Sequence, residues 1–284
     1  MGTPARAPHE LGVSELAAAY RAGTLTPTDA VEACLAQCER VDGNLRSFQA
    51  VYAEEARAAA AAATEKLRAA IAAGAADALP LMFGIPLGLK DIIDVAGKVT
   101  TAGSATRLDH TVDASAPIAR HLLEDSGGIL VGKLKTVEFA RGGYGTNQRM
   151  GTPVNPWTYP DTFTHLVPGG SSSGSGVSVA SFQLPCAVGT DTGGSVRLPA
   201  AFCGTVGTGG TARARVAAPP ARGRPRARRN GPDLTRARAP HAAQASRPRR
   251  TCCRRTASSR SRTPSTRPAR WRGPRWTARS CAAR

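Results

Sequence analysis

Residues 177–204, "VSVASFQLPCAVGTDTGGSVRLPAAFCG", contain an apolar segment, a short strand pattern at 186–191 and a turn rich in glycine. Upstream, "APIARHLLEDSG" (116–127) has the pattern of a helix and "GILVGKLKT" (128–136) has that of a buried strand. Short apolar runs interrupted by Gly and Pro in "MFGIPLGLKDIIDV" (82–95) indicate another strand and turn. Helices that alternate with short strands predict an α/β domain.

The N-terminal part of the chain predicts helices at 10–23, 26–40 and 52–73. The second has a clear start, with Thr26 as N-cap, Pro27 at the first helical position and Asp29 at the third. The third is rich in alanine, and its charged residues indicate an ordinary solvated helix.

The charge of the chain changes abruptly after residue 207. The 284 residues carry a formal net charge of +18, but residues 1–207 have a net charge of −3. Residues 208–284 contain 22 arginines, no lysine and a single acidic residue, Asp233. That segment has almost no large apolar side chains, so it cannot offset its conformational entropy and we expect it to be disordered.

The seven cysteines do not suggest a disulfide framework, because their number is odd and their spacing irregular. No Cys-x-x-Cys pair or His-rich stretch predicts a zinc site. No apolar run approaches the roughly 18 residues of a membrane span, and "MGTPARAPHELG" does not resemble a signal peptide. We therefore expect a cytoplasmic protein without a metal, a cofactor or a membrane partner.

The segment "LVPGGSSSGSGVSVASF" (166–182) permits three interpretations. Its composition is that of a flexible linker. A phosphate-binding loop would need a lysine that is absent here. "GSSSG" matches the G-x-S-x-G nucleophile motif with Ser172 at its centre, but no strand precedes it and the sole later histidine is His241.

A second turn, "GTDTGGSVRLPA" (189–200), places consecutive glycines before Ser195. Such glycines can direct successive N–H groups to one side, as an oxyanion hole beside a nucleophilic serine requires, although a tight structural turn would look similar. Because no histidine is suitably placed, a lysine is a candidate base. Lys90 ends an apolar run, "GIPLGLK", where burial would lower its pKa.

Together, "GIPLGLKD", "PGGSSSGSG" and "GTDTGGSVRLPAAFCGTVG" resemble the motifs of the amidase signature family over about residues 10–207. The resemblance implies a mixed β-sheet flanked by helices and a Ser–cis-Ser–Lys triad. Ser195 resembles the nucleophile, Ser171 the bridging serine in a cis peptide, and Lys90 the base. The N–H groups that resemble the oxyanion hole are those of Thr192, Gly193, Gly194 and Ser195.

Other positions have supporting roles by the same resemblance. Asp191 and Arg197 are expected to support the second turn, and Ser172, Ser173 and Ser175 the first loop. The segment "GGYGTNQRMGTPVNPW" (142–157) is expected to line the approach to the site, and "TYPDTFTHL" (158–166) resembles a small insertion.

The resemblance ends at Gly207, after which "TGGTARARVAAPPARGRPRARRN" replaces the family's Leu-Lys-Pro type continuation. A frameshift near codon 207 would explain this composition. The expected organisation is therefore an incomplete amidase-signature domain at 1–207 and a basic tail at 208–284, with activity in doubt.

Three functions compete at this point. The first is an amidase that cleaves a small-molecule linear amide, with homodimerisation left open; the insertion at 158–166 favours this free-standing enzyme. The second is the A component of a glutamine-dependent aminoacyl-tRNA amidotransferase. The third is non-specific nucleic-acid binding by the arginine-rich tail, with Trp271 and Trp276 stacking on bases.

Overall fold

The computed structural model describes residues 6–160, 165–209 and, for the backbone, 241–246. These residues belong to the first of two units, Met1–Arg249; the second, Arg250–Arg284, lies wholly outside the described residues. The α-helices are α1 (Val13–Arg21), α2 (Pro27–Leu45), α3 (Ala53–Ala72), α4 (Pro117–Arg120), α5 (Ser173–Ala180) and α6 (Arg197–Cys203). The strands are β1 (Phe48–Val51), β2 (Pro86–Lys90), β3 (Ile129–Leu134), β4 (Cys186–Asp191), β5 (Val206–Gly209) and β6 (His241–Ser246). Single helical turns occur at η1 (Pro8–Glu10), η2 (Ala76–Ala78), η3 (Ala105–Arg107), η4 (His121–Asp125), η5 (Glu138–Ala140) and η6 (Pro156–Thr158).

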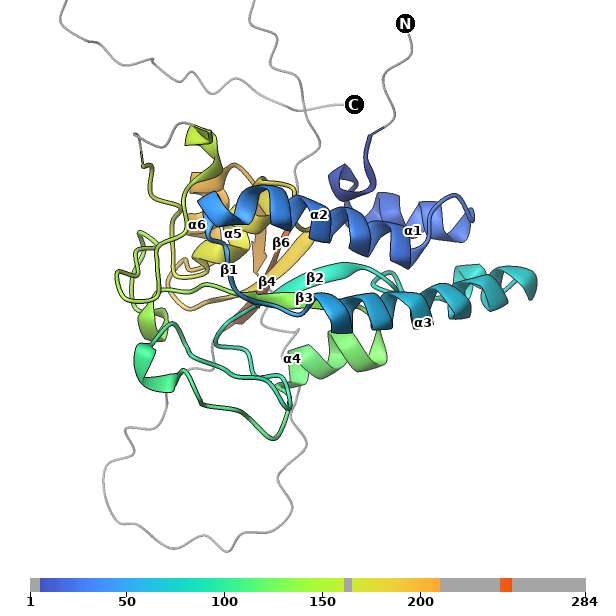
Figure 1. Cartoon of the computed structure of the whole chain (residues 1–284), viewed down its shortest axis with the longest axis horizontal. Coiled ribbons are helices and arrows are strands. Elements are labelled where there is room, and N and C mark those ends of the chain that lie inside the picture. The colour runs from blue at the N-terminus through green and yellow to red at the C-terminus, as the bar shows by residue number, and fades with distance from the viewer. Residues whose placement is uncertain (1–5, 161–164, 210–240, 247–284) are drawn as a thin grey trace, which may run out of the picture. The chain divides into compact units, whose positions relative to one another are not determined.

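The strands form one mixed sheet in the order β1-β3-β2-β4-β6-β5. The central strand β2 is parallel to β3 and β4, whereas β1, β5 and β6 pair antiparallel. Figure 1 shows α1 and α2 along one side of this sheet and α4 on the other. The predicted α/β class with a mixed sheet flanked by helices is confirmed.

Helix α2 begins as its sequence predicts. The Thr26 hydroxyl accepts a hydrogen bond from the Asp29 N–H at 3.2 Å, and the Asp29 carboxylate accepts one from the Thr26 N–H at 2.8 Å. Three alanines of α3, spaced four and three residues apart, are buried in the same core cluster as Val31 and Leu35 of α2; they are Ala56, Ala60 and Ala63. Small side chains at this spacing let the two helices pack closely.

Strand β2 is buried on both faces because it lies between β3 and β4 and is covered by helices. All five of its residues are buried. Leu87 and Leu89 pack with Ala119 of α4 and Leu122 that follows it. The parallel arrangement brings the carboxyl ends of β2 and β4 to one edge of the sheet, which is where the sequence predicts the candidate site.

The structure describes only two parts of the basic tail, residues 208–284. Thr208 and Gly209 end strand β5, and His241–Ser246 form strand β6, which the composition did not predict. The remainder of the segment, with Trp271 and Trp276, lies outside the described residues, as do residues 161–164 of the predicted insertion.

Candidate active site

Lys90 is the last residue of β2 and has no exposed surface. Its burial disfavours the charged ammonium group and lowers its pKa from 10.5 to about 7, although the charge of Asp191 opposes this shift. The sequence expectation of a perturbed lysine therefore agrees with its environment.

Ser171 lies directly beside Lys90. The Lys90 Nζ donates hydrogen bonds to the Ser171 Oγ at 2.7 Å and to the Thr190 Oγ1 at 2.9 Å. The Gly170–Ser171 peptide bond is cis. The Ser171 carbonyl accepts hydrogen bonds from the Thr136 hydroxyl at 3.0 Å and the Val137 N–H at 3.1 Å, so the chain after β3 holds this serine in place.

The glycine–serine loop is an ordered, buried part of the fold and not a tether. Its residues from Gly169 to Gly176 are all buried, and α5 begins within them. A Cβ atom on Gly170 would lie 2.7 Å from the Gly145 nitrogen, which explains why glycine precedes Ser171. The carbonyls of Gly143 and Tyr144 accept hydrogen bonds from the N–H groups of Gly170 and Gly169 at 2.7 and 3.1 Å. The segment at 142–157, predicted to line the approach to the site, is therefore bound to this loop.

The neighbouring serines support this loop. The Ser172 Oγ accepts a hydrogen bond from the Thr190 N–H at 3.3 Å. The Ser173 and Ser175 hydroxyls each have a carbonyl acceptor at 3.4 Å, on Lys135 and Val188 respectively. These contacts join the loop to the chain after β3 and to β4.

The second turn is organised by the carboxylate of Asp191. It accepts hydrogen bonds from the Gly194 N–H at 2.7 Å, from the Val196 N–H at 3.1 Å, and from the Arg197 guanidinium at 3.0 Å to each oxygen. Burial opposes ionisation of Asp191, but these hydrogen bonds outweigh it and lower the pKa of the carboxyl group.

The four predicted oxyanion-hole residues differ in their surroundings. Gly194 N–H is engaged by Asp191, whereas the N–H groups of Thr192, Gly193 and Ser195 have no hydrogen-bond partner in the described part of the chain. Thr192 and Gly193 are exposed, and Ser195 is partly buried. Three of the four N–H groups that the resemblance assigns to the oxyanion hole are thus without an acceptor in this part of the chain.

The structure brings the two serine loops together through their backbones. The Ser172 N–H donates to the Ser195 carbonyl at 3.1 Å. Over the described residues, no hydrogen bond joins the hydroxyls of Ser171 and Ser195. Lys90, Ser171 and Thr190 form the connected cluster, and Ser195 adjoins it.

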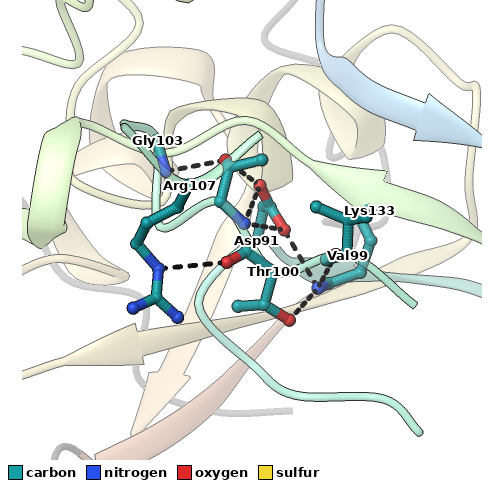
Figure 2. A network of polar contacts seen from close by, with 7 residues as sticks. Asp91, Val99, Thr100, Gly103, Arg107 and Lys133 are labelled. Atoms are coloured by element: carbon teal, nitrogen blue, oxygen red, sulfur yellow. Dashed lines mark hydrogen bonds and ion pairs between the residues drawn. The ribbon is translucent and has the colours of Figure 1, made fainter. Parts of the chain in front are cut away.

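A second buried lysine was missed by the sequence reasoning. Lys133 on β3 forms an ion pair with Asp91 at 2.9 Å, and both side chains are 1% exposed. Figure 2 shows Lys133 also donating to the Thr100 hydroxyl. The Asp91 carboxylate accepts a hydrogen bond from the Thr101 N–H at 3.2 Å. Lys133 stands in an apolar strand pattern, which is the signal that singled out Lys90.

This network fixes the segment that follows Lys90. Burial lowers the pKa of Lys133, and the adjacent Asp91 carboxylate opposes that shift. The Thr101 hydroxyl accepts from the Gly103 N–H at 3.0 Å. The Arg107 guanidinium donates to the Thr100 carbonyl at 3.2 Å (Figure 2). Residues 99–104 are therefore anchored to the end of β2.

Two kinds of feature are absent from the described residues, a candidate metal site and a membrane-spanning helix. Within the described residues, no cluster of three or more His, Cys, Asp or Glu side chains could hold a metal ion. In the same residues, no helix has the length and apolar character needed to cross a membrane.

Comparison with known proteins shows to which family this chain belongs. The amidase family model matches residues 29–218, about two thirds of the chain, so the chain belongs to the amidase family. It is 41% identical over 207 residues to the A component of the glutamyl-tRNA(Gln) amidotransferase from Anaeromyxobacter dehalogenans, covering 73% of this chain and 40% of that protein. The corresponding protein of Chloroflexus aggregans is 42% identical over 199 residues, with 70% and 38% covered.

Solved structures agree with this assignment. A peptide amidase from Stenotrophomonas maltophilia matches with a TM-score of 0.60 and 33% identity over 69% of this chain and 39% of that one. Another amidase matches with a TM-score of 0.66 and 30% identity over 84% and 49%. The chain spans about 40% of the length of the sequence relatives.

Proposed function

We propose that the chain is the N-terminal part of an amidase that hydrolyses the C–N bond of a linear carboxylic amide. One observation carries this proposal: a fully buried lysine with a pKa of about 7 lies 2.7 Å from a serine hydroxyl. A lysine with that pKa is substantially neutral near pH 7 and can accept a proton.

In the proposed mechanism, neutral Lys90 takes the proton of Ser171 while Ser171 takes that of Ser195. The Ser195 oxygen then attacks the amide carbonyl. The developing oxyanion accepts hydrogen bonds from the free N–H groups of the second turn. The separation of the serine hydroxyls is compatible with this step, because catalytic hydrogen bonds often tighten only when substrate is bound.

Collapse of the tetrahedral intermediate breaks the C–N bond. The relay returns the proton to the leaving nitrogen, which departs as ammonia or an amine and leaves an acyl ester on Ser195. The same relay then removes a proton from water, which attacks the ester and regenerates the serine. Every proton transfer is supplied by the side chains of this site.

We also propose the organisation of the chain. Residues 1–207 are the N-terminal part of the amidase domain, and 208–284 are a basic tail produced by a change of reading frame. The charge change and the loss of apolar residues at this point support the proposal. A cytoplasmic location is consistent with the four buried free thiols among the described cysteines.

A second candidate function is that of the A component of an amidotransferase. The two sequence relatives described above carry that name, at 41% and 42% identity. This function requires partner proteins. Strict dependence on glutamine, together with partners that co-purify, would favour it over a free-standing amidase.

The proposal is tested by incubating the chain with a panel of small amides and measuring the release of ammonia or amine and of the acid. Ser195→Ala and Lys90→Met are each expected to lower the rate by at least about 10³-fold. Ser14→Ala and Lys66→Met, which change exposed residues, serve as matched controls. Equal rates in Ser195→Ala and the parent chain would contradict the proposal.

A further inference from the structure

A pocket of about 630 Å³ opens beside the loop that carries Ser171. This volume is within the range of about 300–1,000 Å³ typical of small-ligand sites. Val137 lines the pocket, and its N–H donates to the Ser171 carbonyl at 3.1 Å. The wall of the pocket is thus hydrogen-bonded to the backbone of Ser171, whose hydroxyl belongs to the proposed relay.

The pocket has an excess of positive charge. Arg141 and Arg149 line it and are exposed, and neither guanidinium has an ion-pair or hydrogen-bond partner within the described ranges. Glu138 is the single acidic side chain in the lining, and its carboxylate accepts a hydrogen bond from the Ser104 hydroxyl at 2.7 Å. Guanidinium groups bind carboxylates through two parallel hydrogen bonds, which makes an organic acid a suitable ligand.

The backbone of the pocket wall is unusual. Phe139 and Ala140 have φ angles of 47° and 57°, in the left-handed region, and Ala102 has a φ of 53°. The Phe139 N–H donates to the Ala102 carbonyl at 2.7 Å, so two of these three residues are joined directly, and the Ala140 N–H donates to the Val137 carbonyl at 2.8 Å. Side chains rarely adopt this conformation, and it persists where the surroundings hold it, most often at functional sites.

The surroundings that hold it are visible in the structure. Figure 2 shows the buried Asp91–Lys133 pair and the contacts that anchor residues 99–104. Asn147, also in the pocket lining, donates from its Nδ2 to the Gly103 carbonyl at 2.7 Å. Phe139 is 51% exposed and lines the pocket together with the two arginines.

We propose that this pocket binds the non-reacting part of the amide substrate and selects amides that carry a carboxylate beside an aromatic or similar apolar portion. The carboxylate is held by Arg141 and Arg149, and the apolar portion contacts Phe139. This assignment rests on the proposed amidase function, because it takes the bound molecule to be the substrate of that reaction. The binding of an aromatic carboxylate can be measured without catalysis.

The binding test uses phenylglyoxal, a reagent that modifies arginine, with the modified positions mapped by mass spectrometry on the full chain. Benzoate is expected to slow modification of Arg141 and Arg149 about tenfold, and neutral benzamide is not. Arg120, an exposed and unpaired arginine of α4 within the described residues, and the tail arginines are internal controls that benzoate should leave unprotected. Equal protection of Arg120, or equal effects of benzoate and benzamide, would overturn the proposal.

Substitutions of the pocket residues extend the protection experiment. Arg141→Gln is expected to abolish the protection of Arg149, and Arg149→Gln that of Arg141, because both hold one carboxylate. Phe139→Ala should weaken the protection, whereas Arg120→Gln should not change it. If Arg141→Gln left the protection of Arg149 intact, the shared carboxylate site would be wrong.

A kinetic arm separates this inference from the proposed function. The ratio of kcat/KM for 4-carbamoylbenzoate to that for benzamide should fall about tenfold in Arg141→Gln and stay constant in Arg120→Gln. Protection by benzoate without hydrolysis of either amide would contradict the proposed function and support the anion pocket. Hydrolysis without preference or protection would support the function and overturn the pocket.

Discussion

Lys90 is the residue on which the proposed chemistry depends. Its pKa of about 7 results from burial at the end of the central strand. A base acts in its deprotonated form, so we expect kcat/KM for amide hydrolysis to rise with pH through about 7 and then level off. A pH–rate profile that falls across this range would contradict the assignment of Lys90 as the base.

The same residue predicts a pH dependence of stability. The folded pKa of Lys90 lies below its unfolded value of 10.5, so between about 7 and 10.5 the unfolded chain binds more protons. The free energy of unfolding should therefore rise with pH in this window, by up to about 1.4 kcal/mol per pH unit from one group. Urea unfolding measured across the window should show a smaller slope in Lys90→Met, and the Lys66→Met control should keep the parent slope.

The sequence predicted only some of the residues of the site. Lys90 stood out because it ends an apolar run and Ser195 because consecutive glycines precede it, whereas Ser171 was identified only through the resemblance of "PGGSSSGSG" to the amidase signature motif. Thr190, which accepts a hydrogen bond from Lys90, carried no such signal. Its role follows from the register of β2 and β4, which brings together residues 100 positions apart.

The turn between β4 and α6 acts as one unit around Asp191. Asp191→Asn keeps the shape of the side chain but removes the charge that three N–H groups and a guanidinium satisfy. We expect kcat to fall by about 10²-fold, because the oxyanion donors lose their positions. The KM for a small amide should change much less, and a loss confined to KM would argue against this role.

The Asp91–Lys133 pair joins β3 to the segment after β2. Removing one partner leaves an uncompensated buried charge, so Asp91→Asn and Lys133→Met should each lower the free energy of unfolding by about 3–5 kcal/mol. The double variant should recover part of that loss in a double-mutant cycle. Losses that simply add would show that the two side chains do not interact.

At the level of elements, the longer helices and the central strands β2, β3 and β4 were predicted, whereas β1, β5 and β6, at or near the edges of the sheet, were not. The strand pattern at 186–191 coincides with β4, and the helix expected at 52–73 corresponds to α3, Ala53–Ala72. Strands β1 and β6 were missed because they pair at sheet positions that depend on distant partners. The helix expected at 116–127 is divided into α4 and a wider turn, His121–Asp125.

The whole chain combines a family domain with a segment of different composition. Because the relatives extend well beyond the region matched here, the proposed change of reading frame makes a definite prediction. Sequencing the DNA that encodes residues 195–220 should reveal one inserted or missing base whose correction restores an apolar-patterned continuation. A confirmed frame without such a continuation in either alternative frame would show that the basic segment is genuine.

The central claim is that Ser195 is a nucleophile activated by Lys90 through Ser171. A fluorophosphonate, which reacts covalently with activated serines, tests this without knowledge of the substrate. Peptide mapping of the labelled full chain should place the adduct on Ser195. Labelling should be lost in Ser195→Ala and Lys90→Met and kept in Ser14→Ala and Lys66→Met. An adduct on a different serine, or undiminished labelling of Ser195 in Lys90→Met, would contradict the account.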